Sequence, residues 1–150
     1  VFSVDLAGSS LKRGMDNFAL NNLDQDGRGK FVREDVLKWL ARQERKRERD
    51  PDVYDYWDLI ICDPPVFGSG GKGLTFHVER QWPELARQIR LLLSSEGIAL
   101  FANNHRSGIE SFYRAELQKH FKTVTSFTPP LDFPVLEGEL EHVRIYWCEV

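Results

Sequence analysis

Residues 57–62, Trp-Asp-Leu-Ile-Ile-Cys, constrain the fold more than any other part of the chain. The segment is short and almost continuously apolar, which is typical of a strand buried on both faces of a sheet. It belongs to a series in which strand-like and helix-like patterns alternate along the sequence. Such alternation predicts an α/β fold with a mostly parallel sheet and helices on both of its faces.

The spacing of apolar residues defines the other expected elements. Upstream, it predicts strands over 1–5 and 30–33, a helix over 11–23, and a helix that opens at Val36 and continues through the charged stretch 41–50. Downstream, it predicts a glycine-rich loop over 68–73, a helix over 83–93, a strand over 97–102, a helix over 111–120, a strand over 123–127, a proline-rich loop and a last strand over 142–149. No repeat or linker interrupts the series, so we expect one domain over residues 1–150.

The composition narrows the class of protein. The 150 residues are 41% apolar and 12% aromatic, as in a globular domain, and the net charge of -3 gives no overall attraction to nucleic acid. Any RNA affinity must therefore be local. Cys62 and Cys148 lie far apart and outside any Cys-x-x-Cys spacing, so we expect no metal site and no disulfide. Without an export pattern or an apolar run of roughly 20 residues, we expect a cytoplasmic protein with no membrane partner.

Three acids follow predicted parallel strands: Asp5, Asp35 and Asp63. Ligands of open α/β sheets bind beyond the carboxyl ends of the strands. A carboxylate there can accept from ribose hydroxyls, and one placed a unit later can accept from the amine of adenine. The three acids therefore predict a nucleoside pocket, although Asp5 and Asp35 could also simply cap the helices that follow them.

The proline loop, which we define as residues 63–66, is the sharpest signal in the sequence. Pro64 and Pro65 fix the backbone direction directly after Asp63 and leave carbonyl groups free to accept hydrogen bonds. Phe67 then offers a ring on which an unstacked base could lie. The pattern predicts a loop that holds a flipped nucleobase beside a second ligand.

Residues 56–70, YWDLIICDPPVFGSG, resemble the motif of bacterial ribosomal RNA methyltransferases, and the guanine N7 enzymes of the large subunit are the most similar. The likeness extends to Phe76, Val78, Arg80, residues 101–106, Asp132, Phe133 and His142. It implies a Rossmann-like class I methyltransferase sheet, mostly parallel with an antiparallel last strand. It also implies S-adenosylmethionine as cofactor and large-subunit ribosomal RNA as partner.

The resemblance assigns roles to individual residues. Asp5 and Leu6 would bind the ribose of the cofactor, Asp35 and Val36 its adenine, and Asp63 the region near its methionine end. The catalytic loop would consist of Asp63, Pro64, Pro65 and Phe67. The RNA base or its phosphates would contact Phe67, Arg80, Asn104 and Arg106.

The chain also departs from the family pattern. Members carry a first, central strand followed by a glycine-rich loop, whereas Val1 resembles the start of their second strand. We therefore expect a sheet that lacks this N-terminal central strand and has exposed edges, through which the chain could self-associate. A module that keeps the fold for binding or assembly, without the chemistry, is the competing function.

Cytosine C5 methylation is a further alternative, because it needs a cysteine thiolate to activate the ring. The related enzymes place that cysteine after the strand over 97–102, where this chain has Asn103 and Asn104. Cys62 should point to the face opposite Asp63 and pack as a small apolar residue. Residues 24–35 imitate a calcium-binding loop, but Arg28 occupies a ligand position and Asp35 replaces the usual glutamate. The charged stretch 41–50 is best explained as a solvated helix end.

Overall fold

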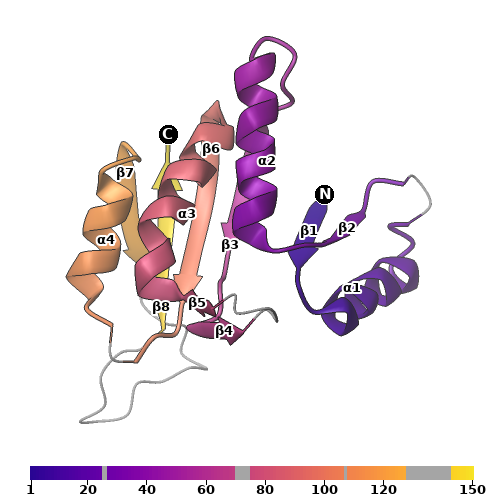
Figure 1. The fold of residues 1–150 in the computed structure, drawn as a ribbon, viewed down its shortest axis with the longest axis horizontal. Coiled ribbons are helices and arrows are strands. Elements are labelled where there is room, and N and C mark those ends of the chain that lie inside the picture. The colour runs from indigo at the N-terminus through magenta and orange to yellow at the C-terminus, as the bar shows by residue number, and fades with distance from the viewer. Residues whose placement is uncertain (25–26, 70–74, 107, 128–142) are drawn as a thin grey trace. The chain divides into compact units, whose positions relative to one another are not determined.

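The fold is described from a computed structural model that covers residues 1–24, 27–69, 75–106, 108–127 and 143–150 (Figure 1). The chain forms two compact units, Val1–Arg45 and Lys46–Val150. Whether they act as the single domain expected from the sequence stays a prediction. Within the described ranges, no helix is long and apolar enough to cross a membrane.

The first unit is built on two parallel strands. It contains β1 (Phe2–Asp5), α1 (Gly8–Leu20), β2 (Lys30–Arg33) and the greater part of α2 (Val36–Arg49). β1 and β2 are paired so that Asp5 lies opposite Arg33. Helix α1 packs on this pair, with the ring of Phe18 edge-on to that of Phe31 at 5.2 Å. The βαβα order expected from the apolar spacing is confirmed here.

The second unit contains a four-stranded sheet in the order β3-β6-β8-β7. Its elements are β3 (Trp57–Cys62), β4 (Phe67–Ser69), β5 (Thr75–His77), α3 (Val78–Leu92), β6 (Leu93–Asn103), α4 (Glu110–Gln118), β7 (Thr123–Phe127) and β8 (Arg144–Glu149). β3 is parallel to β6, whereas β8 is antiparallel to both of its neighbours. The mostly parallel sheet with an antiparallel last strand is therefore confirmed.

Helices α3 and α4 pack on the sheet of the second unit (Figure 1). An aromatic cluster fills the space beneath them, because Trp82 contacts the rings of Phe101, Tyr113 and Tyr146 at centroid distances of 5.3, 4.9 and 6.3 Å. The Trp82 indole N–H donates to the carbonyl of Tyr113 at 3.1 Å, so its one polar group is satisfied inside the core.

The expectation that residues 57–62 are buried on both faces is wrong. Leu59 and Ile61 are 54% and 65% exposed, whereas Cys62 is buried. β3 ends the sheet and pairs with β6 alone among the described strands. Cys62 is the strand partner of Phe101, which belongs to the aromatic core, and Leu59 and Ile61 alternate with it towards the other face of the sheet. The apolar run therefore reflects one covered face and one uncovered face.

Two further boundaries differ from the sequence expectation. α3 begins at Val78 rather than at Pro83, so the proline lies inside the helix. The helix can start early because the side chain of Gln81 accepts from the His77 backbone N–H at 2.8 Å. The expected glycine-rich loop is flanked by a short antiparallel hairpin, β4 with β5. Residues 70–74 and the proline-rich segment lie outside the described residues.

Candidate functional site

The proline loop and the turn after β6 leave the same edge of the sheet. Cys62, at the end of β3, is the parallel partner of Phe101 in β6. Because the two strands run in the same direction, Asp63 and Asn103 follow at the same edge. We define the β6 turn as residues 103–106 together with Gly108. The structure thus brings together the two segments of the second unit that carry most of the predicted site residues.

The β4–β5 hairpin places an exposed aromatic ring directly after the proline loop. Phe67 is 56% exposed and faces its cross-strand partner His77, with ring centroids 5.0 Å apart at 71°. The backbone N–H of Val78, the first residue of α3, donates to the carbonyl of Val66 at 3.0 Å. This bond fixes the start of α3 to the proline loop. The predicted residue Arg80 is exposed in the first turn of α3.

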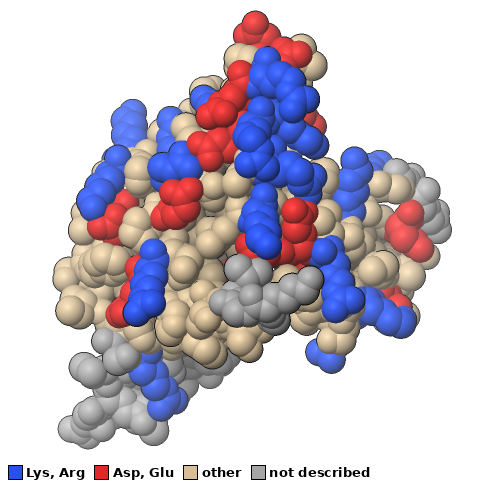
Figure 2. Space-filling model, viewed as in Figure 1, with Lys and Arg blue, Asp and Glu red and all other residues tan. Residues whose placement is uncertain are grey.

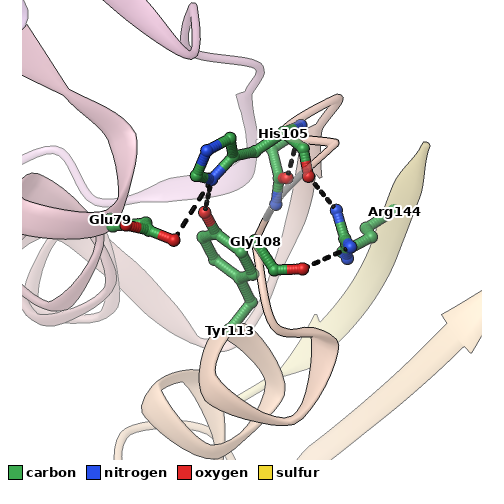
Figure 3. A network of polar contacts seen from close by, with 6 residues as sticks. Glu79, His105, Gly108, Tyr113 and Arg144 are labelled. Atoms are coloured by element: carbon green, nitrogen blue, oxygen red, sulfur yellow. Dashed lines mark hydrogen bonds and ion pairs between the residues drawn. The ribbon is translucent and has the colours of Figure 1, made fainter. Parts of the chain in front are cut away.

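The β6 turn is organised by buried polar groups (Figure 3). Asn103 is 2% exposed, and its side-chain oxygen accepts from the His105 backbone N–H at 3.2 Å. The His105 Nδ1 atom lies 2.7 Å from the Tyr113 hydroxyl and 3.3 Å from Glu79 Oε1. Asn104 points into solvent as an exposed residue beside them. Arg106 is exposed as well, so both predicted RNA contacts of this turn are accessible.

Arg144 holds the same turn from the last strand. Its two terminal nitrogens donate to the carbonyls of His105 and Gly108, each at 2.7 Å (Figure 3). Sequence reasoning missed the roles of Asn103, Tyr113 and Arg144. Their contacts join residues up to 39 positions apart, and no local spacing signals such contacts.

The acids of the first unit lie at one edge of the β1–β2 pair. The Asp5 carboxylate accepts from the Ala7 backbone N–H at 2.7 Å, and the Asp35 carboxylate from that of Lys38 at 3.0 Å. Asp35 therefore caps the N-terminus of α2, which is one of the two roles expected from the sequence. Asp5 stabilises the turn before α1. Leu6 is 46% exposed, and Val36, the first residue of α2, is half-buried.

The predicted gathering of Asp5 and Asp35 with Asp63 involves both compact units. Asp5 and Asp35 belong to the first unit, and Asp63 belongs to the second. The joint pocket therefore stays a prediction. Within each unit, the acids do follow parallel strands at their carboxyl ends, as the sequence indicates.

Neither cysteine is suited to be a nucleophile. Burial, with a smaller contribution from the Asp63 charge, raises the pKa of the Cys62 thiol to about 12. Burial alone raises the pKa of the Cys148 thiol to about 12. Both thiols therefore stay protonated at neutral pH.

Two features of the sequence remain, the calcium-like loop and the charged stretch 41–50. Among the described residues, no group of three or more His, Cys, Asp or Glu side chains could hold a metal ion. Residues 25–26 of the calcium-like loop lie outside the description, and Asp35 caps α2. Figure 2 shows cationic and anionic side chains interleaved over α2, and Arg42 forms an ion pair with Glu34. The charged stretch is therefore a mixed surface rather than a basic one.

Known proteins resemble this chain in both sequence and structure, although no family model matches it. The ribosomal RNA large subunit methyltransferase K/L of Shewanella pealeana is 32% identical over 136 residues, covering 89% of this chain and 17% of that protein. The protein of the same name from Aeromonas salmonicida is 33% identical over 152 residues, covering 97% and 18%. A solved methyltransferase complexed with SAH superposes with a TM-score of 0.81 at 25% identity, over 99% of this chain and 38% of that one.

This chain has the class I methyltransferase fold. The resemblance inferred from the proline loop and the β6 turn is confirmed by these relatives. The chain spans less than a fifth of the length of the curated relatives it matches. It therefore corresponds to one segment of a class I methyltransferase within those longer proteins.

Proposed function

We propose that this chain takes part in S-adenosylmethionine-dependent methyl transfer to a base of ribosomal RNA, with a guanine nitrogen as the acceptor. The supporting observation is the shared edge of β3 and β6, where the proline loop, the exposed ring of Phe67 and the β6 turn meet. The names of the curated relatives supply the class of substrate. A cytoplasmic location follows from that substrate.

The acids of the first unit suit the nucleoside part of the cofactor. Asp5 and Asp35 lie at one edge of the β1–β2 pair and present carboxylates, which accept from hydroxyl and amine donors. Each accepts from one backbone N–H, and a carboxylate can accept several more hydrogen bonds. We assign Asp5 with Leu6 to the ribose, and Asp35 with Val36 to adenine. S-adenosylmethionine, when bound, supplies a methyl group made electrophilic by its positively charged sulfur.

The second unit suits the base. We assign Asp63 to the region near the methionine end of the cofactor, and Pro64 and Pro65 to a stiff wall beside the acceptor nitrogen. Phe67 would stack on the extruded base. Contacts to the base edge or to phosphates are assigned to Arg80, Asn104 and Arg106. Methyl transfer to a nitrogen lone pair needs alignment more than acid or base catalysis, so these side chains act by positioning.

The buried thiols argue for nitrogen rather than carbon as the acceptor. Cytosine C5 methylation needs a thiolate next to the base. Cys62 and Cys148 are both buried, with the pKa of each thiol raised to about 12. The β6 turn carries asparagines instead. A guanine nitrogen needs no such activation and fits the side chains that are present.

Mass spectrometry of ribosomal RNA from cells with and without the intact gene tests the proposal. We expect deletion to remove one methylguanine and complementation to restore it. Loss of a 5-methylcytosine would instead support the carbon alternative. Unchanged methylation, with RNA binding retained by the purified protein, would support a binding or assembly module.

A further inference from the structure

The β6 turn is held from behind by a residue of the last strand. Arg144 begins β8 and is 8% exposed. In the antiparallel pairing it lies opposite Asn103, the last residue of β6. Its guanidinium group therefore lies where β6 ends and the turn begins, on the side of the sheet that α4 covers with Tyr113.

The two arms of the Arg144 guanidinium bind two separate points of the turn. One nitrogen donates to the carbonyl of His105 and the other to that of Gly108, both at 2.7 Å (Figure 3). The group also lies over the Tyr113 ring, 5.7 Å from its centroid. The planar guanidinium group, with its fork of N–H donors, can donate to two carbonyls and lie against an aromatic ring at the same time, whereas a lysine ammonium is a single point charge.

The turn is packed so closely that it has little freedom to shift on these anchors. A Cβ atom added at Gly108 would lie 2.6 Å from Tyr113 Cε2 and 2.7 Å from His105 Nδ1. The His105 ring is in turn held by the Tyr113 hydroxyl and the Glu79 carboxylate. The backbone around His105 is thus fixed on both its side-chain and its carbonyl sides.

We infer that Arg144 is a positioning residue for the RNA-contacting face of the β6 turn. This rests on the proposed function, in which Asn104 and Arg106 contact the base or its phosphates. Those two residues flank His105, whose carbonyl Arg144 binds. Without the fork, the turn would sample several arrangements, and the exposed side chains of Asn104 and Arg106 would lose their fixed direction. A misplacement of about 1 Å can cost on the order of a hundredfold in rate.

The test compares Arg144→Lys with wild type in the full-length protein. Lysine keeps the charge but loses the fork. We expect amide hydrogen exchange of residues 104–106 and 108 to become at least tenfold faster. We also expect kcat/KM for ribosomal RNA to fall at least tenfold, while the Kd for S-adenosylmethionine changes less than twofold. The matched control is Arg114→Lys, at an exposed position of α4, which should leave all three quantities unchanged.

A second variant keeps the inference testable if Arg144→Lys does not fold. Tyr113→Phe retains the packed ring and removes only the hydroxyl that contacts His105. Amide exchange of the β6 turn should therefore become about threefold faster, and kcat/KM for ribosomal RNA should fall about threefold. Faster exchange without a change in RNA kinetics would overturn the inference. So would a parallel loss of cofactor affinity, RNA kinetics and thermal stability, which would mark a purely structural role. Failure of wild type to methylate any RNA would instead refute the proposed function, and exchange of the turn would still decide whether Arg144 holds it.

Discussion

Phe67 and His77 face each other across the β4–β5 hairpin with ring centroids 5.0 Å apart, while more than half of Phe67 remains exposed. The histidine therefore contacts the phenylalanine ring at a steep angle, and much of the phenylalanine side chain stays available. Because the hairpin begins directly after the proline loop, this ring is the best candidate for a stacking surface in the second unit.

Substituting Phe67→Ala should weaken RNA binding and methyl transfer without unfolding the protein. Stacking of one base on an aromatic ring contributes about 1–3 kcal/mol, so affinity should fall by roughly 5- to 150-fold. Phe67→Tyr should retain most of the affinity. Fluorescence anisotropy with an RNA fragment measures the change, and Val53→Ala, at a position 76% exposed, is the control. Equal affinities for Phe67→Ala and wild type would remove Phe67 from the site.

Two variants of Asp35 separate capping from cofactor binding. Asparagine can still accept from the Lys38 N–H, so Asp35→Asn should keep the stability of wild type, whereas Asp35→Ala should lose about 1 kcal/mol. If the second carboxylate oxygen of Asp35 binds adenine, both variants should lower the affinity for S-adenosylmethionine about tenfold, as measured by calorimetric titration. Normal cofactor affinity in Asp35→Asn would leave Asp35 as a cap only.

Replacement of Cys62 by serine should leave methyl transfer within about twofold of wild type. The thiol is buried and its pKa is raised to about 12, so it supplies no thiolate at neutral pH. The buried hydroxyl should cost about 1–3 kcal/mol of stability, because it needs a hydrogen-bond partner. Rates at 20 °C and thermal melts separate the two effects. Complete loss of activity in a folded variant would revive the cytosine mechanism.

The open side of β3 predicts self-association of the isolated 150-residue chain. Leu59 and Ile61 are exposed on the strand that ends the sheet, and such edges pair readily with other chains. Ile61→Lys should weaken association about tenfold, as measured by sedimentation velocity over a concentration series. Leu20→Lys, on helix α1 and 80% exposed, is the control. A wild-type chain that sediments as a monomer throughout would contradict the prediction.

Stability should decline in alkaline solution. Burial raises the pKa of the Cys62 and Cys148 thiols from 9.0 to about 12, and burial is the main cause that raises the pKa of Tyr54 and Tyr113 from 10.0 to about 12. Above pH 9 the unfolded chain releases protons that the folded chain retains, so these four groups should lower the free energy of unfolding from about pH 9 towards pH 12. Urea titrations at several pH values measure this. In the double variant Cys62→Ser, Cys148→Ser, the free energy of unfolding should begin to fall only at about pH 10. If the variant and wild type lose stability over the same pH range, the buried thiols are not the cause of the loss above pH 9.

Local patterns were sufficient for several elements of the fold. The strands over 30–33, 57–62 and 123–127 were predicted with the bounds that the structure has, because acids, glycines or prolines flank short apolar runs. β6 is longer than predicted because Leu93 pairs with Trp57 across the sheet, which no local pattern signals. The early start of α3 combines a local contact, between Gln81 and His77, with the bond between Val78 and Val66, which no local pattern signals.

Some residues of the candidate site are likewise signalled by local sequence patterns, and others are not. Asp63, Asn104 and Arg106 were predicted because each stands in a short motif directly after a recognisable strand. Arg144 was not, because its partners His105 and Gly108 are brought to it only by the antiparallel pairing of β6 with β8. Exposed residues that could contact a substrate are thus readable from the sequence, whereas the buried residues that orient them are not.

In the sheet of the second unit, β8 lies between β6 and β7, although it follows both of them in the chain. β7 precedes β8 in the chain and, among the described strands, pairs with β8 alone, so it can join the sheet only after β8 has been synthesised. A chain released from the ribosome before Arg144 would therefore leave β7 unpaired and the β6 turn unanchored. Pairing of β8 thus joins β7 to the sheet and brings Arg144 to the β6 turn at the same time.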